Sequence, residues 1–314
     1  MASISDFGLS SGGSGNDGRP ESIALFLNGQ RGLSIANHLA EAGHRVTGFF
    51  LHGSAVTSKK LLRILFPDAE VTKVDGANWP SVAYALTKAK TQIGIVAGFS
   101  YLIPEEVLRI PQAGFINLHA GPVPKYRGGS PLNWQMIEGE PSIGVSILRM
   151  TTGLDDGPVV ASGALEPSPA STIADVHAAA ELMFGDLLLR VLENLPLAIS
   201  RAKPQRSADA MYWHQRSDRD GRINVWMQAA EEICRMVRAL THPYPGAWFT
   251  RGGDAFRVFA AKDSSRTFRG APGRIVNVSE SGPILIVRSG SVQLQEVTCD
   301  SSVRPLRNGD YLDA

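Results

Sequence analysis

The chain has 314 residues, of which 43% are hydrophobic and 19% are charged, a balance typical of folded proteins and not of disordered ones. Thirty-one basic residues against 30 acidic residues leave a formal net charge of +1, which disfavours a protein that grips a polyanion through a strongly basic surface. This length is sufficient for two domains of ordinary size.

The first segment, 1–20, is rich in Gly and Ser and lacks the apolar middle of a signal peptide, so we expect a disordered tail. No uninterrupted apolar run reaches the ~18 residues of a transmembrane helix, and we expect a cytoplasmic location. Cys234 and Cys299 have no metal-ligand or redox spacing, and we interpret both as small core residues.

From Ile23 onward, short apolar runs alternate with segments of helical periodicity. Strands are expected at 23–29, 45–53, 70–75, 93–103, 114–121, 144–150 and 158–165, and helices at 32–43, 58–66, 81–90, 104–110 and 171–195. This alternation predicts an α/β fold over residues 21–200, with a doubly wound, Rossmann-like parallel sheet covered by helices on both faces.

The C-terminal region, 201–314, is predicted to form a second, smaller domain. A polar, Pro-containing stretch at 198–210 is interpreted as the linker. Beyond it, helical spacing at 229–240 is followed by short strands separated by Gly and Pro turns, at 256–262, 273–278, 283–290 and 291–298. This pattern favours a helix with a small OB-like β-barrel.

The first strand-to-helix turn tests a dinucleotide-binding hypothesis. It contains Gly29 and Gly32 without the three-glycine spacing of a Rossmann fingerprint. The second strand ends at His52, where a carboxylate for the ribose is expected. The sequence therefore disfavours an NAD enzyme.

The stretch FINLHAGPVPKYRGGSPLNW, 115–134, places Asn117 and His119 at the carboxyl end of a buried strand, the edge at which open α/β sheets bind ligands. Side chains two residues apart share a face of the strand. Asn can donate to an oxygen that becomes negative, and His can exchange a proton near neutral pH. A later Gly-bracketed loop offers Asp155 and Asp156 as carboxylates that could orient the imidazole. The pattern predicts an oxyanion donor beside a general acid or base.

Two segments, INLHAGPVPKYRGGSPLNWQMIEGE and GVSILRMTTGLDDGPVV, resemble the N10-formyltetrahydrofolate-dependent formyltransferases. Members of this family formylate methionyl-tRNA or amino sugars linked to nucleotides. The resemblance extends from about Ile23 to the end of the chain. The segments SDRDGRINVW, HPYPGAWF and PGRIV are similar to the second domain of the same enzymes.

This resemblance implies transfer of a formyl group from N10-formyltetrahydrofolate to a primary amine, without a metal. The family's Asn-x-His element corresponds to Asn117 and His119. Its Gly-Leu-Asp-x-Gly element corresponds to 153–157, which selects Asp155 as the third catalytic residue. Asn117 would stabilise the developing oxyanion, His119 would share the charge or take the amine's proton, and Asp155 would hold the imidazole in place.

The resemblance also implies binding residues. In the family the pterin lies beside the strand that corresponds to 95–104, and largely backbone groups contact it. The expected residues on the folate side are Val96, Gly98, Phe99, Leu102 and Asp156. The family's Tyr-Arg-Gly-x-x-Pro…Trp element supplies the expected substrate-side residues Tyr126, Arg127 and Trp134. Between the two roles open to Arg127, anchoring of its loop is favoured over contact with a phosphate, and for Trp134 helix-to-sheet packing is favoured over stacking on a ligand.

The acceptor amine is the least determined part of this prediction. After the second strand, where the tRNA enzyme carries an Arg-rich insertion, the basic residues are only Lys59, Lys60 and Arg63, and the second domain has no basic run. The segment 216–226 is closer to the sugar-nucleotide enzymes. We favour the amine of a nucleotide-linked sugar, with another small-metabolite amine or methionyl-tRNA as alternatives.

No membrane or nucleic-acid partner is expected, and a homodimer is compatible with this interpretation. A non-catalytic folate-binding module is disfavoured because all three catalytic residue types are present.

Overall fold

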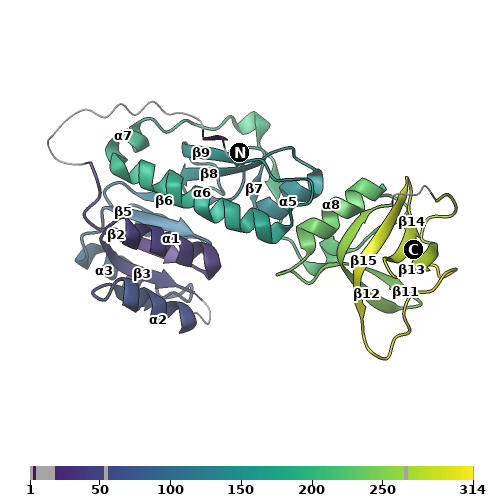
Figure 1. The fold of residues 1–314 in the computed structure, drawn as a ribbon. Coiled ribbons are helices and arrows are strands. Elements are labelled where there is room, and N and C mark those ends of the chain that lie inside the picture. The colour runs from purple at the N-terminus through teal and green to yellow at the C-terminus, as the bar shows by residue number, and fades with distance from the viewer. Residues whose placement is uncertain (1–2, 5–17, 53–55, 265–267, 314) are drawn as a thin grey trace. The chain divides into compact units, whose positions relative to one another are not determined.

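A computed structural model describes residues 3–4, 18–52, 56–264 and 268–313, and its contacts divide the chain into two units (Figure 1). Unit 1 comprises Met1–Gly128, Gly144–Leu165 and Ala178–Tyr212, and unit 2 comprises Gly129–Ile143, Glu166–His177 and Trp213–Ala314. This division differs from a single boundary near residue 200. The reason is that helix α5 (Pro131–Glu138) packs against helix α8 (Ala230–Leu240) and so belongs to unit 2.

The sheet of unit 1 has the strand order β1-β9-β8-β6-β5-β2-β3-β4. Its strands are β1 (Ser3–Ile4), β2 (Ile23–Leu27), β3 (Val46–Leu51), β4 (Glu70–Lys73), β5 (Ile93–Ala97), β6 (Phe115–His119), β8 (Ile143–Arg149) and β9 (Val159–Leu165). The five strands from β4 to β6 are parallel, which confirms the predicted α/β class. Strand β8 departs from the all-parallel expectation because it pairs antiparallel with β6. A buried strand shows the same apolar run in either direction, so the sequence did not distinguish the two.

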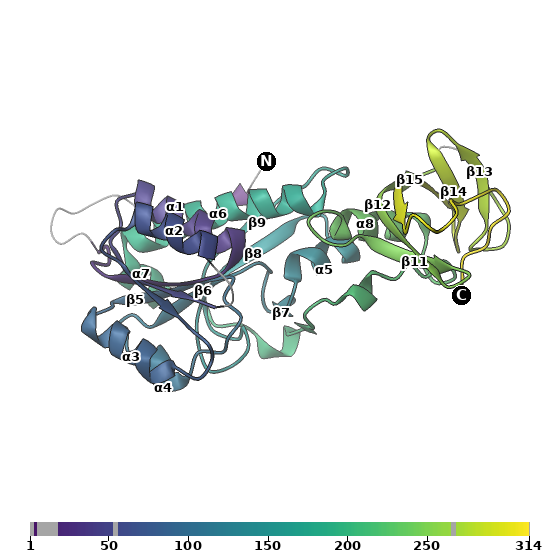
Figure 2. The ribbon, with the colours of Figure 1, turned by 90° about the horizontal axis from the view of Figure 1, so that it is seen from below.

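The helices of unit 1 lie on both faces of this sheet, as the doubly wound prediction requires. They are α1 (Gly29–Glu41), α2 (Val56–Leu65), α3 (Trp79–Lys88), α4 (Glu105–Leu108), most of α6 (Ile173–Glu193) and α7 (Leu195–Ser200). Figure 2 shows α1, α2 and α6 on one side of the sheet and α3 and α4 on the other. Among the described residues, no helix has both the length and the apolar character needed to cross a bilayer.

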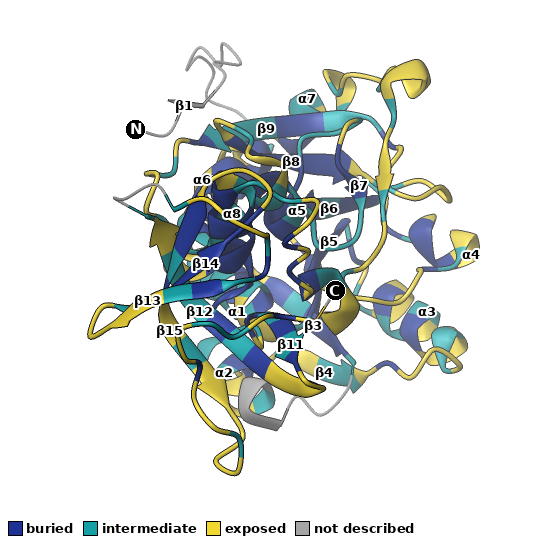
Figure 3. Cartoon of the chain, turned by 90° about the vertical axis from the view of Figure 1, so that its right-hand side faces the viewer, coloured by how far each residue is buried: buried dark blue, intermediate teal, exposed yellow. Residues whose placement is uncertain are grey.

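An aromatic core fixes the central strands of unit 1. Phe26 stacks on Phe50 with 4.3 Å between ring centroids, and Phe115 meets Phe26 edge-on at 5.2 Å. All three side chains are buried, and Figure 3 shows the central strands largely in the colour of buried residues. Because side chains alternate between the faces of a strand, this packing also fixes which β6 residues share the face of Phe115.

Only part of the predicted tail, 1–20, is described. Ser3 and Ile4 form β1, which pairs antiparallel with β9 opposite Ala164 and Gly163. Residues 5–17 lie outside the described part, so the prediction of disorder there stays a prediction.

Unit 2 contains a five-stranded antiparallel sheet with the order β11-β12-β15-β14-β13. Its strands are β11 (Ala247–Arg251), β12 (Asp254–Asp263), β13 (Ile275–Ser279), β14 (Gly282–Ile286) and β15 (Ser291–Cys299). The segment 310–313 touches both edge strands: the Ile275 N–H donates to the Asp310 carbonyl, and the Asp313 N–H donates to the Thr250 carbonyl, each at 2.8 Å. The C-terminal segment thus joins the two edges, as in a small barrel-like domain.

The remaining elements are short. They are β7 (Arg127–Gly128), which pairs with β10 (Tyr212–Trp213), and the 3₁₀ helices at Ser207–Asp209 and Asp218–Gly221. Cys234 is buried on α8, as expected, whereas Cys299 is exposed at the end of β15. The core interpretation of Cys299 is therefore wrong, because the apolar alternation that precedes it ends with the strand.

Candidate active site

Strand β6 places Asn117 and His119 on one face of the sheet, at its carboxyl end. Asn117 is paired with Val96 on the parallel strand β5 and with Leu148 on the antiparallel strand β8. Phe115, two residues earlier on the same face, is anchored in the aromatic core. His119 is buried, whereas Asn117 is half-buried. The amide and the imidazole are thus positioned by a rigid strand, as the sequence predicted.

The loop 150–158 between β8 and β9 brings Asp155 to this pair. One carboxylate oxygen, Oδ1, accepts from Asn117 Nδ2 at 3.3 Å, and Oδ2 lies 3.5 Å from His119 Nδ1. The Gly128 N–H donates to Oδ2 at 2.9 Å. The exposed fractions of the His119 and Asp155 side chains are only 6% and 12%. The amide, imidazole and carboxylate chosen from the sequence therefore converge in the structure, although they come from two segments of the chain.

The contact made by Nε2, the second ring nitrogen of His119, indicates which of the two nitrogens carries a proton. Nε2 lies 2.6 Å from the Tyr126 carbonyl oxygen, which can only accept a hydrogen bond, so Nε2 carries a proton. Nδ1 is then the nitrogen that can exchange a proton with Asp155. A donor amide beside such a pair can stabilise negative charge on a carbonyl oxygen while a proton moves nearby, which is the chemistry of acyl transfer.

Tyr126 and Arg127, predicted on the substrate side, are both almost fully buried, with 1% and 2% exposed. The Arg127 guanidinium donates through Nε and Nη2 to Gln205 Oε1 at 3.0 and 2.8 Å, and through Nη1 to the Tyr212 hydroxyl at 2.6 Å. These contacts support the anchoring role that was favoured for Arg127. Direct substrate contact by either side chain is a prediction without such support.

Trp134, the third predicted substrate residue, lies on α5 in unit 2. Its Nε1 donates to the His214 carbonyl at 3.0 Å, and its ring lies 5.2 Å from that of Trp213. These contacts support a packing role for Trp134.

The predicted folate-side residues have very different exposures. Val96 is buried within β5, whereas Gly98 and Leu102 are exposed, Leu102 to 80%, and Phe99 is half-buried. Gly98 has φ +72°, and a Cβ there would lie 2.8 Å from the Asn28 carbonyl oxygen. The segment after β5 therefore needs glycine at this turn. Asp156, the fifth predicted residue, is exposed on the loop 150–158, and the Thr151 hydroxyl donates to its carboxylate.

Three groups that contact the candidate catalytic residues were not predicted. Two are backbone groups, the Tyr126 carbonyl and the Gly128 N–H, for which no side-chain type gives a signal. The third is the Gln205 side chain, which lies in the stretch interpreted as a linker and donates to the Asp155 carbonyl at 2.8 Å. A polar residue in a polar stretch carries no sequence pattern that separates it from its neighbours.

His52, at the end of β3, holds the segment that follows β5. The Ser100 N–H donates to its Nε2 at 3.2 Å, which only an unprotonated nitrogen can accept. Its ring also meets Phe99 at 5.1 Å and Tyr101 at 5.3 Å, both edge-on. Burial lowers the pKa of His52. His44 behaves similarly, because burial and nearby Arg19 lower its pKa.

The lowered pKa values of His52 and His44 predict that the stability of the fold depends on pH. The unfolded chain takes up their protons near pH 6.5 and the folded chain only at lower pH, so stability present above that value is lost as the pH falls below it. We expect the free energy of unfolding to decrease between pH 7 and pH 5. The substitution His52→Gln keeps an acceptor without titrating and should reduce this decrease, with His44 accounting for the remainder. Urea unfolding at several pH values measures both slopes, and identical slopes would remove His52 from the explanation.

Comparison with known proteins finds formyl transferases in both parts of the chain. Residues 54–192 match the formyl transferase family, and residues 216–303 match the formyl transferase C-terminal domain. The methionyl-tRNA formyltransferase of Geobacter metallireducens is 30% identical over 233 residues, which cover 74% of this chain and 73% of that protein.

Solved structures show the same fold at lower identity. An N-formyltransferase from Helicobacter canadensis, in complex with folinic acid and dTDP-3-aminofucose, has a TM-score of 0.63 at 13% identity, covering 88% of this chain and 98% of that chain. A variant of HypX from Aquifex aeolicus has a TM-score of 0.64 at 20% identity, covering 90% of this chain and 45% of that chain.

Proposed function

Because the chain belongs to the formyl transferase family, we propose that it moves a formyl group from N10-formyltetrahydrofolate to the amine of a nucleotide-linked amino sugar. Family membership makes it a folate-dependent formyltransferase; the sugar acceptor is our proposal. The convergence of Asn117, His119 and Asp155 carries the proposal of the reaction centre. A cytoplasmic location and a homodimer stay predictions.

The reaction makes three demands on the protein. The amine must lose a proton as it bonds to the formyl carbon, the formyl oxygen must accept negative charge, and N10 must be protonated as it leaves. The half-buried Asn117 amide is the donor for the oxygen. His119 Nδ1 and the Asp155 carboxylate, 3.5 Å apart, accept the amine's proton and pass it towards N10. Such acid–base catalysis typically contributes on the order of 100- to 10,000-fold.

The folate side of the proposed site is the segment that follows β5. Phe99 offers a half-buried ring, and Leu102 an exposed apolar side chain, which suit an aromatic pterin. Gly98 is exposed at its turn, so a ligand could approach its backbone. Asp156, exposed on the loop 150–158 next to Asp155, completes this proposed surface.

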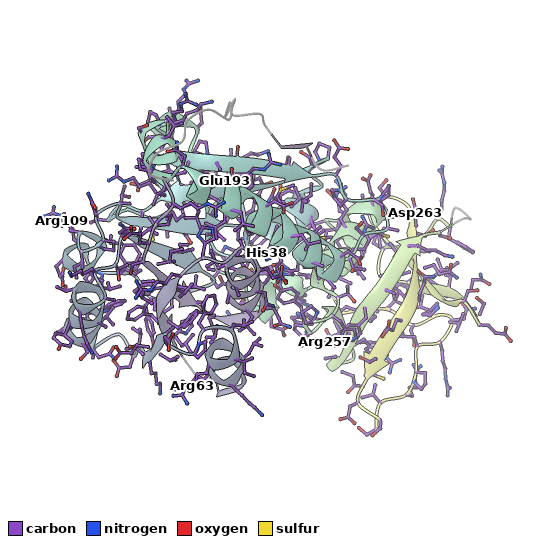
Figure 4. The ribbon with its side chains drawn as sticks, turned by 60° about the vertical axis from the view of Figure 1, so that its left-hand side comes forward. His38, Arg63, Arg109, Glu193, Arg257 and Asp263 are labelled. Atoms are coloured by element: carbon purple, nitrogen blue, oxygen red, sulfur yellow. The ribbon has the colours of Figure 1, made fainter. Side chains whose placement is uncertain are left out.

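The charge distribution of unit 2 supports a small acceptor over transfer RNA. Arg257, labelled on this unit in Figure 4, pairs with both Asp218 carboxylate oxygens at 2.6 and 2.8 Å. Among the residues of unit 2 that the structure describes, carboxylates lie within 4.0 Å of Arg235, Arg251, Arg257, Arg288 and Arg304. Binding to a phosphate backbone requires positive charge that is not already compensated. On α2, Figure 4 labels Arg63, one of only three basic residues between Leu51 and Phe66.

Methionyl-tRNA is the second candidate acceptor. The observation that favours it is the 30% identity with a methionyl-tRNA formyltransferase over most of both chains. The two acceptors differ in one measurable respect, because transfer-RNA binding weakens steeply with salt and binding of a single nucleotide-sugar does so far less.

The proposal is tested by incubating the protein with N10-formyltetrahydrofolate and a panel of amines: initiator methionyl-tRNA, several nucleotide-linked amino sugars and free amino acids. We expect formylation of a nucleotide-linked amino sugar, with kcat/KM changing little between 50 and 200 mM salt. The control is the same panel with the formyl donor omitted. Exclusive formylation of methionyl-tRNA would refute the acceptor and leave formyl transfer intact, whereas no product with any amine would refute the proposed function.

A further inference from the structure

The side-chain amide of Gln205 connects the loops that carry the candidate catalytic residues. Gln205 follows α7, and its position is fixed by Lys203, which exchanges two backbone hydrogen bonds with Val159 at 2.8 and 2.9 Å. Val159 is the first residue of β9 and directly follows the loop 150–158. The supposed linker is thus a strand-like segment beside the loop of Asp155.

All four hydrogen-bonding positions of the Gln205 amide are used. Nε2 donates to the Asp155 carbonyl at 2.8 Å and to the Gly157 carbonyl at 2.7 Å. Oε1 accepts twice from the Arg127 guanidinium, at 3.0 and 2.8 Å. A primary amide has two donor and two acceptor positions, so one side chain is saturated by two loops that are far apart in sequence.

The first of these loops needs such support. Asp155 has φ +49°, a left-handed conformation that non-glycine residues seldom adopt and that persists where the surroundings impose it. Gln205 donates to the carbonyls of Asp155 and Gly157, one on each side of Asp156, and can therefore hold the chain in this turn. With this backbone conformation, the Asp155 carboxylate points towards Asn117 and His119.

The second loop contacts the same catalytic side chains. Arg127 lies between Tyr126, whose carbonyl accepts from His119 Nε2, and Gly128, whose N–H donates to the Asp155 carboxylate. Fixing Arg127 therefore fixes the backbone partners of both His119 and Asp155. Gln205 joins this loop to the backbone carbonyls of the Asp155 turn.

We propose that Gln205 is a positioning residue for formyl transfer, which holds the Asp155 carboxylate against His119 without contacting the reactants. This inference rests on the proposed function. It predicts that loss of the two Gln205 donors lowers kcat while the KM values for amine and formyl donor stay nearly constant.

The substitution Gln205→Glu tests the two halves of the amide separately. Glu keeps two acceptors for Arg127 and strengthens that contact with charge, but it loses both donors and places an oxygen against two carbonyls. We expect kcat to fall roughly 10- to 100-fold, as a misplacement of about 1 Å can cause, with both KM values within about threefold. The control is Gln112→Glu, which adds the same charge at an exposed position just before β6 and should leave the kinetics unchanged.

A double-substitution cycle separates positioning from general stabilisation. In an Asp155→Ala background, Gln205→Glu should change the residual rate by less than about threefold, because there is no carboxylate left to position. Wild-type kcat for the single variant, or the same loss of rate in both backgrounds, overturns the proposal.

A crystal structure of Gln205→Glu decides the same point without activity. We expect Asp155 to leave the left-handed region and its carboxylate to move beyond 3.5 Å from His119 Nδ1. An unchanged Asp155 overturns the positioning role even if kinetics change. If the wild-type enzyme formylates no amine, the proposed function fails, and the crystal structure still decides whether Gln205 positions Asp155.

Discussion

Replacement of His119 by Ala is expected to lower kcat for formyl transfer by about 100- to 10,000-fold, the usual range for loss of an acid–base group. The imidazole contacts both the Asp155 carboxylate, 3.5 Å from Nδ1, and the loop of Tyr126, whose carbonyl oxygen lies 2.6 Å from Nε2. Binding of the formyl donor should persist, because the proposed folate segment at 98–102 does not depend on this ring. Steady-state kinetics and equilibrium binding of a folate analogue measure the two quantities.

A second variant separates chemistry from packing. His119→Gln retains an N–H for the Tyr126 carbonyl but cannot exchange a proton, so it should be as inactive as the Ala variant and more stable. His242→Ala is the matched control, because that ring is 70% exposed in unit 2, and its kcat should equal that of the wild type. Substantial turnover by either His119 variant would exclude the imidazole from the mechanism.

Gly121→Ala is expected to impair both stability and activity, although it adds only one methyl group. The new Cβ would lie 2.6 Å from the Tyr126 carbonyl oxygen and 3.0 Å from His119 Nε2, closer than van der Waals contact allows. Backbone must move to relieve this overlap, at a cost of about 1–3 kcal/mol for a crowded buried site. Because the displaced carbonyl orients the imidazole, kcat should fall about 100-fold. Urea unfolding and steady-state kinetics measure the two effects.

The matched control for this variant is Gly221→Ala. Its Cβ would meet the tip of the Leu240 side chain at 3.3 Å, which can yield by rotation, so a small loss of stability and unchanged kcat are expected. Equal effects of the two substitutions would mean that the contact of Gly121 with the imidazole's partner is unimportant.

The parts of the candidate site that depend on residues close together in the sequence were largely predictable. Asn117 and His119 stand two apart in an apolar strand, which alone requires that they share a face. The choice between Asp155 and Asp156 was not local. Sequence spacing left both open until the family resemblance selected Asp155, and in the structure Asp155 meets the pair while the Asp156 carboxylate accepts from the Thr151 hydroxyl.

The unpredicted parts of the molecule depend on partners distant in sequence. Gln205 contacts Asp155 and Arg127 across 50 and 78 residues, and its surroundings in the chain are ordinary polar residues. An anchoring role for Arg127 was the favoured prediction, but its partners Gln205 and Tyr212 lie too far along the chain for a sequence pattern to identify them. Strand β8 pairs antiparallel with β6 although its apolar run resembles those of the parallel strands.

By itself, the amino-acid sequence determined the alternation of strands and helices and the shared face of Asn117 and His119, because apolar periodicity and turn chemistry act between near neighbours. Tertiary structure alone decided which backbone groups hold the imidazole and which amide contacts the left-handed turn of Asp155. Those contacts exist only once the sheet has brought remote segments within hydrogen-bonding distance, and no short-range pattern encodes that approach.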